Sequence, residues 1–101
     1  EILVKQMFMQ KIFRLFVKYL TSDLKKIFGL EHNTKITDLS LANNRILHID
    51  GLDTLKDLQT LSLSNNALSE LDELYYLRPI RFPKLRSVAT WGNPMTQVKS
   101  A

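Results

Sequence analysis

The sequence contains no cysteine, few glycines and prolines, and no long uninterrupted apolar run. Without cysteine the chain cannot form disulfides, thiolate zinc sites or cysteine nucleophiles, and this fits a reducing compartment. The three glycines, Gly29, Gly51 and Gly92, lie too far apart to form a phosphate-binding loop. Lysines and an arginine interrupt the N-terminal apolar segment, so no stretch reaches the roughly 18 residues of a transmembrane helix.

Groups that could support catalysis or hold a metal are also scarce. There are two histidines, His32 and His48, and the His48-x-Asp50 pair has no third metal ligand at a matching spacing. No base stands beside a serine or threonine in a pattern typical of nucleophilic catalysis. We therefore predict a protein that is not an enzyme and that binds no metal, cofactor or small-molecule substrate.

The charge is unevenly distributed along the chain. Its net charge is +4, but residues 1–35 carry +4, residues 36–73 carry −5 and residues 74–101 carry +5 with no acidic residue. Two basic ends thus flank an acidic middle. Basic surfaces attract nucleic acids, acidic proteins and anionic membranes, so charge alone does not choose among these partners.

A repeated pattern, Leu-x-x-Leu-x-Leu-x-x-Asn, occupies residues 36–44, 58–66 and 85–93. The apolar positions are filled by aliphatic residues except at Thr90, and the repeats start 22 and then 27 residues apart. Repeats of this length stack as a solenoid, in which each unit contributes a short strand with its apolar side chains turned inward. Each repeat ends in an asparagine; these residues are Asn44, Asn66 and Asn93.

We interpret the three asparagines as a structural ladder and not as a ligand site. After each strand the chain must turn sharply, and a buried amide side chain can bond the backbone groups that the turn leaves unpaired. The segments that return to the next strand have apolar spacings typical of helical or 3₁₀ structure.

The N-terminal residues have a different pattern. Apolar residues recur at helical spacing from Phe8 to Ile27, and Gly29 is a plausible stop, so we predict helices that cap the solenoid over residues 1–35. The predicted fold is α/β: a short solenoid of about three repeats with parallel strands and an N-terminal helical cap. The repeats are expected over 36–57, 58–84 and 85–98.

No cap follows the third repeat in the sequence. We therefore expect a bare third strand, which would need a pairing partner outside this chain or allow self-association. This arrangement indicates a fragment of a larger protein.

Strand alternation predicts a polar concave surface. Its residues are Asp38, Ser40, Ala42, Thr60, Ser62, Ser64, Ser87, Ala89 and Trp91. Most are small, which would leave the surface open to a protein partner. An exposed Trp91 would be a binding hot spot; alternatively, it packs against a further repeat or a cap.

Two basic sets are candidate RNA-binding residues. The first lies at the end of the second repeat and the start of the third; it comprises Arg78, Arg81, Lys84 and Arg86. The alternative for this set is a solvated loop. The second is a stripe on the predicted N-terminal helix, comprising Lys11, Arg14, Lys18 and Lys25. A basic amphipathic helix can also bind membranes or protein grooves, but its apolar face is already used by the cap, and we predict no membrane binding.

Residues 36–46 and 58–68 resemble the leucine-rich-repeat superfamily. A narrower resemblance is to the leucine-rich domain of the nuclear mRNA export receptors, the TAP/NXF family. It rests on the apolar segment from Met7 to Leu20, the two Asn-Asn repeats, the longer basic second limb, and residues 82–86 leading to 92–94. This chain departs from that family in its shorter first repeat and in Thr90.

The narrower resemblance implies a nuclear or nucleocytoplasmic protein that takes part in mRNA transport and nuclear export by binding RNA and export adaptor proteins. Other intracellular leucine-rich proteins are similar too: type-1 phosphatase regulators, the A-prime protein of the spliceosomal particles, and cytoskeletal adaptors. The alternative hypothesis is therefore a protein-only docking scaffold. Loss of RNA affinity when the charges of Arg78, Arg81, Lys84 and Arg86 are reversed would favour the export hypothesis. Protein binding that is sensitive to Trp91→Ala but not to this charge reversal would favour the docking hypothesis.

Overall fold

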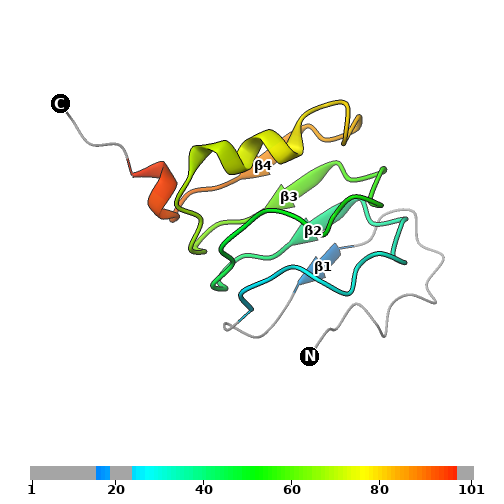
Figure 1. Ribbon diagram of the computed structural model, residues 1–101. Coiled ribbons are helices and arrows are strands. Elements are labelled where there is room, and N and C mark those ends of the chain that lie inside the picture. The colour runs from blue at the N-terminus through cyan, green and yellow to red at the C-terminus, as the bar shows by residue number, and fades with distance from the viewer. Residues whose placement is uncertain (1–15, 19–23, 98–101) are drawn as a thin grey trace.

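The computed structural model describes residues 16–18 and 24–97, which build a parallel sheet of four short strands. The strands lie side by side in chain order (Figure 1): β1 (Phe16–Lys18), β2 (Asp38–Ser40), β3 (Thr60–Ser62) and β4 (Ser87–Ala89). Each pair is parallel and in register, with Leu39, Leu61 and Val88 aligned. The prediction of parallel strands in one sheet is confirmed.

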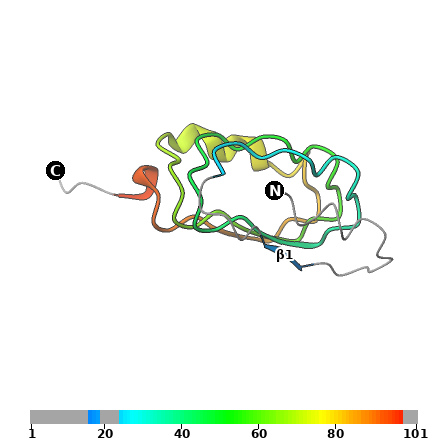
Figure 2. The ribbon, with the colours of Figure 1, turned by 90° about the horizontal axis from the view of Figure 1, so that it is seen from below.

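The returning limbs form a second layer opposite the sheet (Figure 2), so each coil is a flattened loop. Between β3 and β4 the limb contains the 3₁₀ helix η2 (Leu71–Leu77), and the short η3 (Pro94–Thr96) follows β4. The limb between β2 and β3 consists of turns, and residues 16–18 and 24–97 contain no α-helix. The helical or 3₁₀ prediction therefore holds only for the longer limb. Its helix ends before Arg78, which is extended as the residue preceding Pro79 must be.

The predicted N-terminal helix is wrong where the structure describes it. Phe16–Lys18 form β1, which pairs in parallel with β2, and residues 24–35 form an irregular limb that buries Ile27 and Leu30. The apolar residues that fit a helical period also fit one more coil, and pairing with β2 together with core burial outweighs helix propensity. The remainder of the predicted cap, including Lys11 and Arg14, lies outside the described residues.

This correction removes the predicted basic helix stripe. Lys18 belongs to β1, and Lys25 is an exposed residue of the limb that precedes β2. The four basic residues are therefore not presented on one helical face. No membrane- or groove-binding helix can be argued from them.

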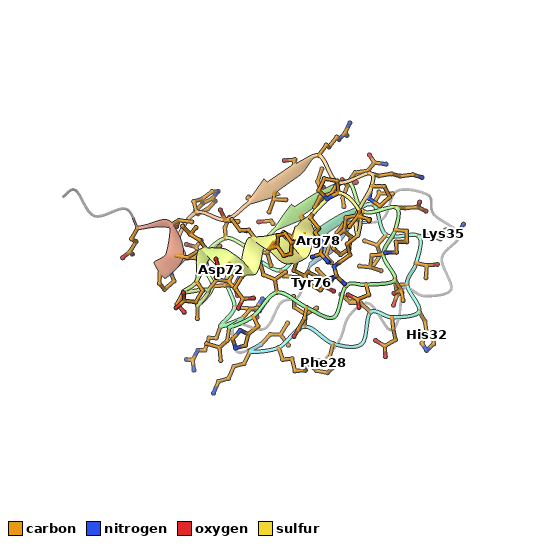
Figure 3. All side chains as sticks on the ribbon, turned by 45° about the horizontal axis from the view of Figure 1, so that its top comes forward. Phe28, His32, Lys35, Asp72, Tyr76 and Arg78 are labelled. Atoms are coloured by element: carbon orange, nitrogen blue, oxygen red, sulfur yellow. The ribbon has the colours of Figure 1, made fainter. Side chains whose placement is uncertain are left out.

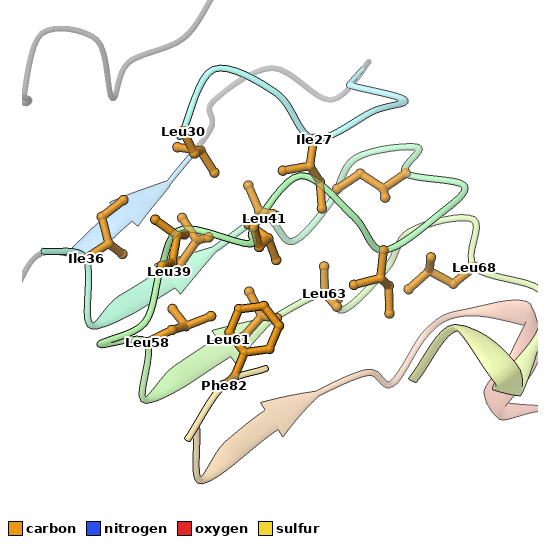
Figure 4. Close-up of a cluster of buried hydrophobic side chains, with 14 of the residues drawn as sticks. Ile27, Leu30, Ile36, Leu39, Leu41, Leu58, Leu61, Leu63, Leu68 and Phe82 are labelled. Atoms are coloured by element: carbon orange, nitrogen blue, oxygen red, sulfur yellow. The ribbon is translucent and has the colours of Figure 1, made fainter. Parts of the chain in front are cut away.

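A single column of aliphatic side chains fills the space between the sheet and the limbs (Figure 4). Strand residues such as Leu39 and Leu61 are 2% exposed and meet limb residues such as Leu52 and Leu55, which are completely buried. Phe82 closes the layer between the second and third coils. Burying one such side chain contributes roughly 1.5–3 kcal/mol, so this column supplies most of the favourable free energy of folding.

Asn44, Asn66 and Asn93 connect each coil to the one before it. Their Oδ1 atoms accept hydrogen bonds from the backbone N–H groups of the preceding coils, those of Leu24 (3.2 Å), Ile46 (3.0 Å) and Leu68 (3.0 Å) respectively. All three asparagines are buried. Each amide therefore satisfies a backbone donor that no secondary structure would satisfy.

The amide nitrogens of the same side chains donate to backbone carbonyls. Asn66 Nδ2 donates to the carbonyls of Leu41 (3.0 Å) and Leu63 (2.9 Å), and Asn93 Nδ2 donates to those of Leu63 (2.8 Å) and Thr90 (2.9 Å). The Leu63 carbonyl, for example, accepts hydrogen bonds from both Asn66 and Asn93. The result is a continuous chain of side-chain and backbone hydrogen bonds along the solenoid.

The residue before each of these asparagines has a left-handed backbone. Asn43, Asn65 and Gly92 occupy this position in successive coils, with φ of 64°, 58° and 81°. Asparagine tolerates this region better than other side chains do. Glycine fills this position in the last coil, where a Cβ on Gly92 would overlap the side-chain oxygen of Asn65 and force that side chain to move.

Candidate functional site

The solvent-facing side of the sheet is made of three short columns that run across the coils. Strand register aligns Asp38 with Thr60 and Ser87, and Ser40 with Ser62 and Ala89. The third column contains the residues that follow each strand: Ala42, Ser64 and Trp91. We call these nine residues the concave surface. Its side chains are small apart from Trp91, so a partner can approach the backbone closely.

The structure corrects the predicted exposure at two positions of the concave surface. Asp38 is buried because its carboxylate accepts hydrogen bonds from the hydroxyls of Thr60 (2.5 Å) and Thr37 (3.2 Å) within the stack. Ser64 is completely buried, although strand alternation places it on the solvent side. Both residues therefore support the surface from within and do not present polar atoms to a partner.

The other predicted residues are accessible. Ser40, Thr60 and Ser62 are half-buried, and Ser87 is exposed. Trp91 is 64% exposed, and its carbonyl accepts the N–H of Asn65 at 2.9 Å, which fixes its position at the end of the third column. A large indole held on an otherwise flat and polar surface is the residue type that anchors protein interfaces.

We call Arg78, Arg81, Lys84 and Arg86 the basic cluster. The sequence spacing suggested that no acids lie near it, but the structure places two acids beside it. Arg81 Nη1 lies 3.5 Å from Asp53 Oδ1, and Lys84 Nζ lies 2.9 Å from Asp57 Oδ1. Both acids belong to the preceding coil, where stacking brings them beside the cations. Two of the four cations of this cluster are thus paired with acids of the same chain, while Arg86 forms no ion pair with a described residue.

Two tyrosine rings pack against arginines of this cluster in the longer limb, the one between β3 and β4. Asp72, Tyr76 and Arg78 of this limb are labelled in Figure 3. The Arg78 guanidinium stacks on Tyr75 at 4.3 Å, and that of Arg81 stacks on Tyr76 at 4.5 Å. The Tyr76 hydroxyl donates to Asp53 and accepts the N–H of Leu52. Burial, together with the hydrogen bond to Asp53, raises the pKa of Tyr76 to about 12.

These side chains border a shallow open cavity of about 310 Å³ on the limb side of the molecule. Its lining residues are Asp72, Glu73, Tyr75, Tyr76, Arg78 and Arg81. Two of these residues are acidic and two are basic, so the cavity does not concentrate charge of one sign. Glu73 is already engaged, because it accepts hydrogen bonds from the His48 ring (2.8 Å) and the Ile49 N–H (2.9 Å). The cavity therefore lacks the features of an anion site.

A charge column runs beside the start of the strands. Lys35, Asp57 and Lys84 occupy the same position in three successive coils. The hydrogen bond and charge of Lys84, and to a smaller extent the charge of Lys35, lower the pKa of Asp57. Positive and negative side chains thus alternate along the solenoid at this position, and the column ends on a lysine.

Among residues 16–18 and 24–97 no three histidine or carboxylate side chains gather as metal ligands, and His48 is paired with Glu73 and not with Asp50. No described helix is long and apolar enough to cross a membrane.

Comparison with known families identifies the repeat. Residues 34–76 match the family model described as leucine-rich repeats (2 copies). No curated protein matches the sequence significantly. The matched segment contains β2, β3, Asn44 and Asn66, so these two coils are similar to leucine-rich repeats.

Solved structures extend the likeness to nearly the whole chain. Seven chains of solved structures match. One is a chain of the Drosophila melanogaster SNF/U2A' complex, with 31% identity and a TM-score of 0.73 over 95% of this chain. The match covers 53% of that protein, so the present chain spans about half its length. The comparisons lend no support to the narrower resemblance to mRNA export receptors.

Proposed function

We propose that this chain of leucine-rich repeats is a protein-docking module of the intracellular leucine-rich class, with the concave surface as its binding site and no catalytic role. The observation that carries the proposal is the exposed Trp91, held at the end of a strip of small side chains. Burial of an indole under a partner is a typical source of binding energy, and the small neighbours leave room for the side chains of that partner.

The likeness to a chain of the SNF/U2A' complex supports the same function, because that chain was solved in a complex. It also favours the spliceosomal A-prime protein among the alternatives named from the sequence. We therefore propose SNF, or a protein like it, as the first partner to test. A nuclear location follows from the same comparison and stays a prediction.

RNA binding and mRNA export are not part of the proposal. Two of the four cations in the basic cluster are paired with Asp53 and Asp57. The remaining two, Arg78 and Arg86, do not form the continuous basic track along which proteins bind single strands.

The test is titration calorimetry of the 101-residue chain with purified SNF, comparing wild type, Trp91→Ala and Ile80→Ala. Ile80 is a matched control, because it is also apolar and exposed (84%) but lies outside the sheet. We expect Trp91→Ala to weaken binding by about 2 kcal/mol or more, roughly 30-fold, and Ile80→Ala to leave it unchanged. Equal effects of the two variants would exclude the concave surface, and no binding of SNF would exclude that partner.

A further inference from the structure

The cavity beside η2 is built against the preceding coil, on the limb side of the molecule. Glu73, Tyr76 and Arg81 line it, and each is also hydrogen-bonded to a residue of that coil, at 2.9 to 3.5 Å. The inner wall of the cavity is therefore formed by two neighbouring coils of the described chain.

The 3₁₀ geometry of η2 sorts its side chains into rows, because residues three positions apart lie on the same face. Leu74 and Leu77 pack on the core. Asp72 and Tyr75, with Arg78 directly after the helix, form another row, in which Tyr75 is 70% exposed. Figure 3 shows Asp72 and Arg78 at opposite ends of the helix. This row therefore presents an acid, an aromatic ring and a base in that order.

The charged groups around the cavity keep hydrogen-bonding capacity that the protein does not use. Asp72 is exposed and forms no ion pair with a described residue. Arg78 bonds the Tyr75 carbonyl through Nη1 at 3.1 Å, and Arg81 Nε is buried and donates to no group in the described part of the chain. A buried donor without a partner is unfavourable, so an acceptor that enters the cavity gains a hydrogen bond.

The two signs of charge specify a dipolar ligand. The two acids of the lining lie at the start of η2, and the two arginines lie directly after the helix and beyond it. Among the described residues, neither acid pairs with either arginine. A purely anionic ligand, such as a nucleic acid, would meet two carboxylates, and a purely cationic ligand would meet two guanidinium groups. A ligand that carries one base and one acid satisfies both ends.

The spacing between the charges selects an extended peptide. The backbone positions of Asp72 and Arg78 are about 12 Å apart along a 3₁₀ helix, but the Arg78 guanidinium folds back onto Tyr75 at 4.3 Å, which brings the charges closer together. On an extended strand, side chains two positions apart lie on one face about 6.6 Å from each other, and those four apart lie about 13 Å from each other. The shorter of these spacings fits the cavity.

We propose that this cavity binds an extended segment of a partner protein in which a basic and an acidic residue stand two positions apart, as in Lys-x-Glu. The basic side chain meets Asp72 and Glu73, and the acidic one meets Arg78 and Arg81. The chain of the segment lies over the two tyrosines. This site is on the limb side of the molecule, so it is separate from the concave surface and does not rest on the docking function proposed for that surface.

The experiment is an NMR chemical-shift titration of the full chain with the capped, neutral peptide Ser-Lys-Ser-Glu-Ser. The comparison probe is its isomer Ser-Ser-Lys-Glu-Ser, which directs the two charges to opposite faces of an extended strand. We expect the first peptide to shift the backbone amides of η2 and Arg81, and the isomer to bind roughly tenfold more weakly. Asp72→Lys and Arg78→Glu should each weaken binding of the first peptide roughly tenfold, because each turns an attraction into a repulsion.

Matched controls separate this site from general charge effects. Glu70→Lys and Arg86→Glu make the same charge changes at exposed residues that do not line the cavity, and Trp91→Ala alters the concave surface. All three should bind the first peptide as wild type does. Circular dichroism verifies that each variant is folded. The proposal is overturned by equal binding of the two peptides, by no binding of the first, by cavity variants that bind as well as their controls, or by shifts confined to β2, β3 and β4.

Discussion

Replacing Asn66 by alanine should destabilise the chain by about 3 kcal/mol. The substitution removes the acceptor of the Ile46 N–H, which lies in the core, and an orphaned buried donor costs roughly 1–3 kcal/mol. Its amide protons also bond carbonyls, but each of these keeps another partner: Asn44 for Leu41, Asn93 for Leu63, and the Asn43 N–H for Ser64. These losses therefore add only about 1 kcal/mol in total.

The assay is urea unfolding followed by circular dichroism, with Asn65→Gly as the matched control. Asn65 is the neighbouring asparagine, but its side chain makes an exposed bond to Asn43, and glycine already fills this left-handed position in the next coil. The control should stay within about 0.5 kcal/mol of wild type. In a thermal melt, Asn66→Ala should lower Tm by roughly 12–24 °C. A loss below about 1 kcal/mol, or one no larger than that of Asn65→Gly, would refute the role of the buried amide as a tie between coils.

Three further outcomes follow from the described geometry. Gly51→Ala should cost at least about 2 kcal/mol in urea unfolding, because φ is +78° and the new Cβ would lie 2.6 Å from the Ile27 carbonyl oxygen; a neutral effect would contradict the tight contact. Burial tends to raise the pKa of Glu73, but hydrogen bonds from His48 and Ile49 bring it below its usual 4.5. A carboxyl group whose pKa is lowered in the folded state stabilises the fold at pH values above its unfolded pKa, and this contribution is lost as the pH falls through the folded pKa. Glu73→Gln should therefore flatten the acid limb of a profile of stability against pH. An unchanged acid limb would exclude Glu73 as its source. Any single-stranded RNA affinity should show a log–log salt slope nearer about −1.4 than about −2.8, because Arg81 and Lys84 are already paired; the steeper slope would show that these pairs open for RNA.

The repeated strands were predictable because side-chain identity alone determines them. A leucine at every second strand position leaves one inward face, and an asparagine at the turn meets a recurrent backbone need, so both could be derived from spacing. The same 22-residue spacing, applied backwards from Ile46, Ile49 and Leu52, reaches Leu24, Ile27 and Leu30. That signal for one more coil was present, but the helical period of the same apolar residues obscured it.

Contacts between coils were not predictable, because they depend on how the unequal limbs stack. Arg81 meets Asp53, a residue 28 positions earlier, whereas Lys84 meets Asp57, 27 positions earlier. No single repeat length aligns both pairs, so the cluster appeared to lack acids. The burial of Asp38 has a similar cause: its hydroxyl partner Thr60 comes from the next coil, and strand alternation alone predicts exposure.

The asparagine ladder also determines how the molecule responds to a mechanical load. Its hydrogen bonds run along the solenoid axis, and each joins only neighbouring coils. A pulling force applied along that axis therefore loads them one interface at a time, as in unzipping, and not all together, as in shear. Each rupture frees one repeat, about 22 residues, and lengthens the chain by roughly 75 Å. The chain should extend in steps at low force, each step the release of a single coil.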